Sequence, residues 1–185
     1  MMRFLRALLS PFNVIALLLA LLAYGAVAYV QRPPTVPAPP KVSQTLTTTK
    51  VSLYFATPDM GGYFSQDRDV QVQDNLPQEV AQASLRAWVA GPKNAAGRGL
   101  AVVPPTSEVP QVWSRGQHYY VSLPQGYSNL NYGQTGERML LCSITQTLLS
   151  VRGQDVKFLV AGADAATLLG HMDLRTPYTK ADCQL

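Results

Sequence analysis

The hydrophobic positions divide the chain into an apolar N-terminal run and a body with alternating and helical patterns. Residues 7–31 carry no charged side chain, and residues 14–30 are apolar apart from Gly25. A helix of roughly 20 apolar residues crosses a hydrocarbon core about 30 Å thick. The pattern therefore predicts a single-pass transmembrane anchor over residues 7–31.

Basic residues set the expected orientation of this anchor. Arg3 and Arg6 lie in the short segment 1–6, which the positive-inside rule keeps in the cytoplasm. The expected location is the bacterial cytoplasmic membrane, with the C-terminal body outside. A cleaved signal peptide is the alternative, because residues 26–28 (Ala-Val-Ala) fit a small-x-small cleavage pattern. The length of the run favours the anchor, and both interpretations export the body.

Residues 32–49 separate the apolar run from the body and are rich in proline and threonine. Five prolines occur in residues 33–40. Such composition favours extended polyproline II at about 3.1 Å per residue. We expect an extracytoplasmic stalk here, either a spacer that holds the body away from the membrane or a passive linker, followed by a folded domain at residues 50–185.

Within the body, period-two alternation predicts strands and helical spacing predicts two helices. Asn75 is expected to cap the first helix, and Gly91-Pro92 to end it. The predicted strands cover residues 50–56, 68–73, 100–103, 109–114, 117–123 and 156–161. The first helix is expected between Asn75 and Gly91, with Pro77 in its first turn, and the second over residues 134–151. This order is not a regular βαβ alternation. It predicts a compact α+β domain with two helices packed on one face of a mixed β-sheet.

Charge argues against a nucleic-acid partner. The formal net charge is +4, but Arg3 and Arg6 precede the apolar run, and the rest of the chain is nearly neutral. Its lysines and arginines are scattered singly, whereas phosphate binding requires basic residues clustered on one face. We therefore expect no nucleic-acid binding.

Candidate catalytic and metal chemistry is sparse. The sequence lacks the common nucleophile-elbow, zinc-protease and phosphate-loop motifs. Residues 171–173 (His-Met-Asp) offer two ligand types, fewer than a zinc site draws on. Cys142 lies among apolar residues of a predicted helix, where a thiol is usually inert. We expect no catalytic residue, no metal, no cofactor and no enzymatic activity.

The two cysteines, Cys142 and Cys183, are candidates for a disulfide. An extracytoplasmic location is an oxidising context. The bridge would contribute about 4 kcal/mol in the chain-entropy model and would hold the C-terminal tail on the second helix. Two free thiols are the alternative.

A tyrosine- and asparagine-rich segment follows the predicted hairpin. Its candidate saccharide- or partner-binding residues are Tyr127, Asn129, Asn131 and Tyr132. Aromatic rings flanked by amides can stack on sugars. The alternative is packing of the rings in the core and loop, with hydroxyls at the surface.

The order of several short motifs resembles the GerMN domain family of sporulation and spore-germination proteins. The similarity covers about residues 50–180. It rests on residues 53–55 (Leu-Tyr-Phe), Arg68, 85–92 (LRAWVAGP), Val103-Pro104 with Thr106, the hairpin 112–123 around Gly116, 145–148 (TQTL), 156–160 with Gly162, and Pro177. The chain departs from the family at Ser122, where aspartate is usual, and at Ala161-Gly162, where Asp-Gly is common. It also lacks a lipid-attachment cysteine near the end of the apolar run.

The resemblance implies a non-catalytic extracytoplasmic interaction domain, similar to ring-building modules of envelope-spanning assemblies. The leading hypothesis is a membrane-tethered scaffold that binds copies of itself or another envelope protein, through the edge of the first or last strand. A peptidoglycan- or saccharide-binding module or a cell-wall enzyme is the rival hypothesis. A regulator that acts on a neighbouring membrane protein through the apolar helix is a third.

Overall fold

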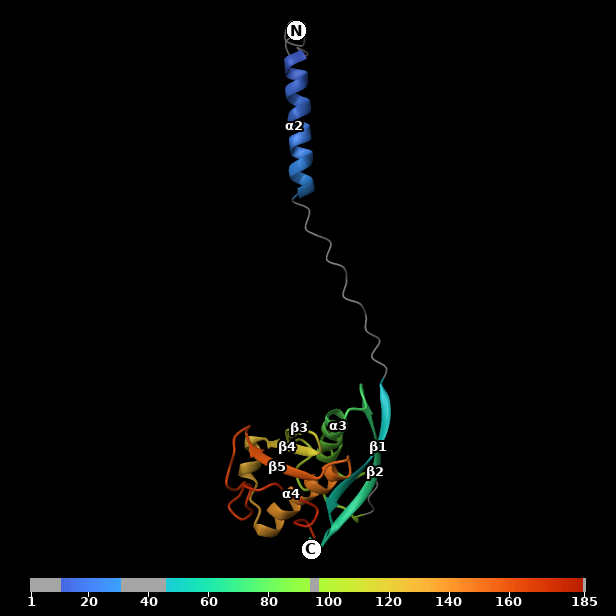
Figure 1. The fold of residues 1–185 in the computed structure, drawn as a ribbon, viewed down its shortest axis with the longest axis vertical. Helices are drawn as coiled ribbons and strands as arrows, with labels where there is room; N and C mark the ends of the chain where they lie inside the picture. The colour runs from blue at the N-terminus through green and yellow to red at the C-terminus, as the bar shows by residue number, and fades with distance from the viewer. Residues whose placement is uncertain (1–10, 31–45, 94–96, 185) are drawn as a thin grey trace. The chain divides into compact units, whose positions relative to one another are not determined.

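The computed structural model describes residues 11–30, 46–93 and 97–184, and the chain forms two compact units, residues 1–43 and 44–185. The first unit contains helix α2 (Pro11–Val30). The second contains the other helices and the strands (Figure 1). This second unit is the domain discussed below.

Helix α2 lies within the run for which we expected a membrane-spanning anchor. Residues 7–10 and 31 of that expected anchor lie outside the described residues. Across the ranges that the structure does describe, no helix is long and apolar enough to cross a membrane. The predicted transmembrane helix is thus not supported by the structure.

The first two strands form a long antiparallel hairpin, β1 (Thr47–Ala56) and β2 (Tyr63–Val72). Alternate residues of β1 point into the core, and Val51, Leu53 and Phe55 are buried there. Both strands begin earlier than predicted, because the cross-strand pairing continues beyond the hydrophobic alternation.

The earlier start of β1 also changes the C-terminal boundary of the predicted stalk. Residues 47–49 belong to β1 and pair with residues 70–72, so these three stalk residues are part of the sheet. Residues 32–45 of the predicted stalk lie outside the described residues.

Helix α3 (Pro77–Val89) ends before Gly91 as predicted, but it lacks the predicted cap. Its N-cap is Leu76, which makes no side-chain capping bond. Asn75 instead accepts a hydrogen bond from the Thr49 hydroxyl (3.1 Å). The end of the helix follows the prediction, since Gly91 adopts a φ of 78°, in the left-handed region that glycine favours.

Residues 100–103 do not form the strand that we predicted. Leu100 makes only an isolated bridge to Ala56, whose carbonyl accepts the Leu100 N–H (2.8 Å). Val102 and Val103 are buried in the core. A short apolar run can fill a core without pairing, and period alone does not distinguish the two cases.

The second sheet has three strands in the order β3-β4-β5. Its strands are β3 (Gln111–Arg115), β4 (His118–Leu123) and β5 (Asp155–Val160). Strands β3 and β4 form the predicted hairpin, whereas β4 and β5 are parallel. Parallel neighbours need a crossover connection. The 3-10 helix η1 (Gln125–Asn129) and helix α4 (Gln134–Leu149) supply it.

The helices lie between two sheets. Helix α3 contacts β1, β2 and β3, and α4 contacts β1 and β5. Figure 1 shows both helices between the β1-β2 hairpin and the three-stranded sheet. The predicted α+β class is confirmed, but the prediction of two helices on one face of a single mixed sheet is wrong. Most of α4 is buried, because a helix covered on several sides has no wide polar face.

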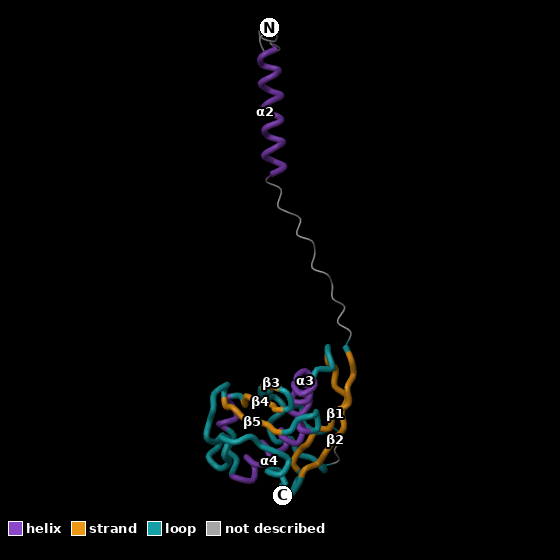
Figure 2. Tube along the Cα trace, viewed as in Figure 1, coloured by secondary structure: helices purple, strands orange, loops and turns teal. Residues whose placement is uncertain are grey.

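After β5, the described chain forms no further helix or strand (Figure 2). This loop nevertheless contributes Leu168, Leu174 and Tyr178 to the core. It therefore belongs to the packed domain.

Candidate functional site

A disulfide joins Cys142 on α4 to Cys183 near the C-terminus, with the Cα atoms 5.3 Å apart. Both cysteines are buried. Two side chains of α4 reinforce the contact: Arg138 donates to the Gln184 carbonyl (2.6 Å), and Gln146 donates to the Cys183 carbonyl (3.4 Å). These bonds hold the tail on α4, and neither sulfur is a free nucleophile.

Glu137, which looks isolated in the sequence, is fully buried in the first turn of α4. Its Oε1 accepts the N–H groups of Leu168 (3.2 Å) and Leu169 (2.9 Å). Its Oε2 accepts the N–H of His171 (2.9 Å). Three main-chain N–H groups thus bond to the two carboxyl oxygens. Glu137 thereby fixes the loop after β5.

The residues considered for a metal or nucleophile do not converge. Within the described ranges, no group of three or more His, Cys, Asp or Glu residues could hold a metal ion. Asp173 pairs with Arg175 (2.7 Å), and hydrogen bonds from Arg175 lower the pKa of Asp173 to about 2. His118 Nδ1 lies 2.9 Å from Asp155 Oδ2 in another part of the surface. In each of these two pairs the side chains therefore bond to each other, in separate places.

The tyrosines of the predicted binding loop serve packing. Tyr127 is buried, and its hydroxyl donates to the Glu108 carbonyl (3.0 Å). Burial raises the pKa of Tyr127 above its ordinary value. The half-buried Tyr132 donates to the Val102 carbonyl (2.7 Å). The exposed members of the segment are Asn129 and Asn131. A sugar therefore has no exposed ring at Tyr127 on which to stack.

Two other aromatic side chains remain exposed, on the outer face of the three-stranded sheet. Trp113 on β3 lies opposite Tyr120 on β4, and their exposed fractions are 42% and 37%. Directly opposed residues have Cβ atoms about 5 Å apart, so the two rings form one patch, here called the aromatic pair. The opposite face of the same strands buries Val112 and Tyr119. Strand alternation therefore directs the aromatic pair away from the core.

A hollow of about 530 Å³ adjoins the aromatic pair and has Trp113 in its wall. Its lining includes Gln111 and Gln125, as well as Ser122 and Gly162. The Ser122 hydroxyl oxygen accepts the Gly162 N–H (2.8 Å). Ser122, one position at which the chain departs from the GerMN pattern, is thus bonded to the residue that follows the other, Ala161, in the lining that also holds Trp113.

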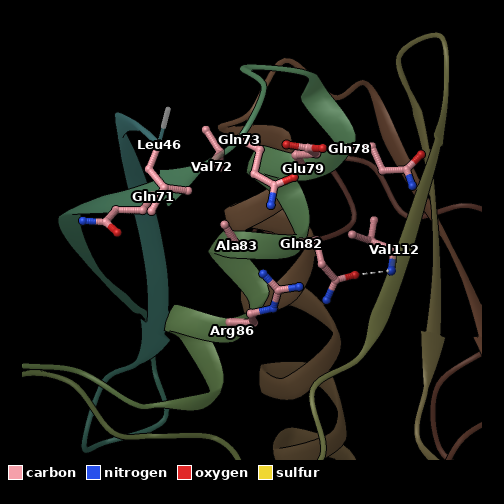
Figure 3. A pocket seen from close by; sticks show the side chains of 10 residues that line it. All are labelled: Leu46, Gln71, Val72, Gln73, Gln78, Glu79, Gln82, Ala83, Arg86 and Val112. Carbon is pink, nitrogen blue, oxygen red and sulfur yellow. Dashed lines mark hydrogen bonds between the residues drawn. The ribbon is translucent and has the colours of Figure 1, made fainter. Parts of the chain in front are cut away.

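A groove runs along α3, beside β3. Its main hollow, about 390 Å³, is lined by α3, by the end of β2 and by β3 (Figure 3). A neighbouring hollow of about 410 Å³ shares Gln78, Gln82, Arg86 and Val112 with it and reaches Trp113. We call the two hollows together the α3 groove. Glutamine side chains and Arg86 make its lining largely polar.

Gln82 connects this groove to the sheet. Its Nε2 donates to the Pro110 carbonyl (3.0 Å), and its Oε1 accepts the Val112 N–H (3.0 Å; Figure 3). The amide thus binds the outer edge of β3, where a neighbouring strand would bind. Nothing in the sequence pattern around Gln82 indicates this role, because it depends on the spacing between α3 and β3.

Residues 52–166, which include the aromatic pair and most of the α3 groove, match the Germane family model, described as sporulation and spore germination. The match covers more than half of the chain. The chain belongs to the Germane family. The predicted GerMN resemblance is thereby confirmed. A comparison with curated proteins finds no match.

Solved structures share the fold of this Germane domain. The crystal structure of a "Putative Lipoprotein from Clostridium perfringens" is 20% identical, with a TM-score of 0.52, and the alignment covers 80% of this chain and 95% of that one. The first GerMN domain of the sporulation protein GerM from Bacillus subtilis is 17% identical, with a TM-score of 0.55. The alignment covers 72% of this chain and 99% of that one. The tandem GerMN domains of GerM align at 11% identity and a TM-score of 0.48, over 80% of this chain and 50% of that one.

Proposed function

We propose that this Germane domain is a non-catalytic protein-interaction module, located outside the cytoplasm and attached to the bacterial cell envelope. The exposed aromatic pair, Trp113 and Tyr120, is the observation that carries this proposal. Its role is to bind an envelope protein or a second copy of the chain and so to build a larger assembly.

The energetics of aromatic side chains support a contact role for this pair. Tryptophan and tyrosine are enriched among the few interface residues that carry most of the binding energy. They bury large apolar areas and lose little side-chain entropy, while their polar atoms still find partners. Trp113 also lines two hollows, which can receive a partner's side chains.

Location outside the cytoplasm is supported by the sequence. The charge-free run 7–31 follows two arginines and is itself followed by a proline-rich segment. The lipoprotein description of the Clostridium perfringens neighbour fits an envelope location. Attachment through residues 1–31 is the finer part of the proposal. Alkaline carbonate extraction of membranes tests it: a protein that is released into the supernatant would contradict attachment.

Photo-crosslinking in the native host tests the interaction role. A photoreactive amino acid replaces Trp113 in the full-length protein, and Lys180, exposed on the C-terminal loop, is the matched control position. We expect discrete protein adducts at position 113 and few at position 180. Wall glycan as the main adduct would favour the saccharide-binding alternative. Absence of any specific adduct would overturn the proposal.

A further inference from the structure

The edge of β1, the first strand, is already occupied. The Tyr54 N–H donates to the Thr147 hydroxyl (3.0 Å), and the Tyr54 carbonyl accepts the indole N–H of Trp88 (3.0 Å). The Ser52 carbonyl accepts the Ser150 hydroxyl (3.0 Å). Side chains of α3 and α4 thus use the main-chain groups that a partner strand would need.

The edge of β5, the last strand, is covered as well. Val156 and Tyr178 exchange two main-chain hydrogen bonds (2.9 and 2.8 Å), and the Val160 N–H donates to the Ala163 carbonyl (2.9 Å). These bonds disfavour the expected pairing of a partner with the first or last strand. Tertiary contacts occupy main-chain hydrogen-bonding groups at both edges.

The remaining outer edges belong to β2 and β3. Asp67 and Asp69 are exposed on β2, and charges on an edge strand oppose pairing with another strand. Strand β3 carries no acidic residue, and its charged residue, Arg115, lies at its end, beside the hairpin turn. Its Val112 N–H points to the outer edge, where Gln82 binds it. Main-chain groups alternate along a strand, so the N–H of Ser114 points to the same edge, and no hydrogen bond to it is found within the described ranges.

The α3 groove lies beside this edge and contains a free cation. Arg86 points into the groove (Figure 3). It is exposed, and its guanidinium makes no ion pair within the part of the chain that the structure describes. The acidic residue in the lining, Glu79, already accepts the Asp74 N–H (2.9 Å). A ligand that lies in the groove and carries a carboxylate would therefore be complementary to Arg86.

We propose that the α3 groove receives an extended, acidic segment of a partner protein, which adds as a fourth strand along the edge of β3. This inference rests on the proposed interaction role and names its mode. The incoming main chain replaces the Gln82 amide at the Val112 N–H and the Pro110 carbonyl, and it pairs with Ser114. A partner carboxylate binds Arg86, and the aromatic pair buries the adjoining apolar side chains.

The exchange of partners at Gln82 makes this addition feasible. A carboxamide offers N–H donors and a carbonyl acceptor, the same kinds of group as the main chain of a strand. Replacing it conserves the hydrogen bonds of the β3 edge, while the released Gln82 side chain can bind water or the new strand. Before the partner arrives, Gln82 keeps the edge from pairing indiscriminately.

The test uses the full-length protein in its native host, with a photoreactive amino acid at Gln78 in the groove. Ser114→Pro removes the outward N–H, and its control Ser114→Ala keeps it. Arg86→Glu reverses the groove charge, and its control Lys180→Glu reverses an exposed charge elsewhere. We expect each test variant to lower the yield of the partner adduct about tenfold, and each control to leave it within about twofold.

The outcomes separate this inference from the broader proposal. Adducts at position 113 together with none at position 78 would overturn strand addition but leave the interaction role intact. Adducts at position 78 that are unchanged by both Ser114→Pro and Arg86→Glu would also overturn it. Should Ser114→Pro fail to fold, which circular dichroism would reveal, the exposed Arg86→Glu decides alone. Loss of adducts at both positions would remove the interaction role and the inference together.

Discussion

The two edges of the three-stranded sheet differ in how they are protected. At β5, main-chain groups of the C-terminal loop complete the ladder, and the loop is itself held by Glu137 and the Cys142–Cys183 disulfide. At β3, a single side chain, Gln82, occupies the edge. A covalently and electrostatically fixed loop is costly to displace, whereas one amide is not. The comparison indicates that the β5 edge is held permanently, whereas the β3 edge is the one at which a partner could replace the existing hydrogen bonds.

The largest expected effect is on the protected edge. Replacing both cysteines by alanine should lower the free energy of unfolding by about 4 kcal/mol, because the bridge, with its sequence separation of 41, constrains the unfolded chain. Urea unfolding of the oxidised protein and the double variant measures the difference. Reduced wild-type protein is the control and should match the variant. An unchanged urea midpoint would show that the tail is held without the bond.

Removal of the buried Glu137 side chain should give the second-largest loss of stability. Glu137→Ala leaves three N–H groups of the loop without their acceptor, and we expect a loss of about 3 kcal/mol in unfolding free energy. Glu137→Gln keeps acceptor oxygen and shape, and should cost less. Denaturant titration of both variants checks the order. Equal losses would indicate that packing, rather than hydrogen bonding, fixes the loop.

Truncation of the aromatic pair should affect binding without affecting the fold. For Trp113→Ala we expect about 2 kcal/mol less binding free energy toward the crosslinked partner, and an unfolding free energy within about 0.5 kcal/mol of wild type. Calorimetric titration with that partner and urea unfolding give the two values. Arg152→Ala, at an exposed residue away from the sheet face, is the matched control. A large stability loss would reassign Trp113 to packing.

The available edge should open when its amide is removed. Gln82→Ala should lower stability by about 1 kcal/mol and speed amide hydrogen exchange at Val112. Exchange at Val156 and Val160, on β5, should keep its wild-type protection. NMR-detected exchange resolves these three amides in one experiment. Equal acceleration on both strands would show that the edges are not independent.

Alkaline pH should weaken the β5 edge. Burial raises the pKa of Tyr178 to about 12, and its hydroxyl donates to the Asp173 carbonyl (2.9 Å). Because the folded-state pKa exceeds the ordinary value near 10, the stabilisation is complete below about pH 10 and is lost as pH rises through 12. Tyr178→Phe should lose less stability across this range. Parallel alkaline denaturation curves would contradict the assignment.

Local pattern predicted the elements well where they are periodic, and poorly where tertiary contacts decide. The first helix ends where predicted, because its apolar spacing and Gly91 are local features. Residues 100–103 are apolar enough for a strand, yet they fill the core without pairing. Asn75 has the chemistry of a cap but bonds to Thr49, because β1 extends further than its hydrophobic alternation.

The candidate site was the least predictable part. Tyr127 attracted attention because aromatic and amide residues cluster around it, but the structure buries it. Alternation in β3 and β4 already places Trp113 and Tyr120 on one face, so the strand pattern could have indicated the exposed pair. Gln82 and Glu137 offered no comparable indication, since their partners are 28 and 31 residues away in the chain.

The sequence by itself determined the α+β class, the approximate positions of the periodic helices and strands, and membership of the Germane family. These follow from side-chain period and from the order of short motifs, which act locally. Only the tertiary structure decided that the helices lie between two sheets, that main-chain groups at the edges of β1 and β5 are bonded to other parts of the domain, and that the Gln82 side chain binds the edge of β3. The physical reason is that an edge is free or covered according to groups brought in from distant parts of the chain.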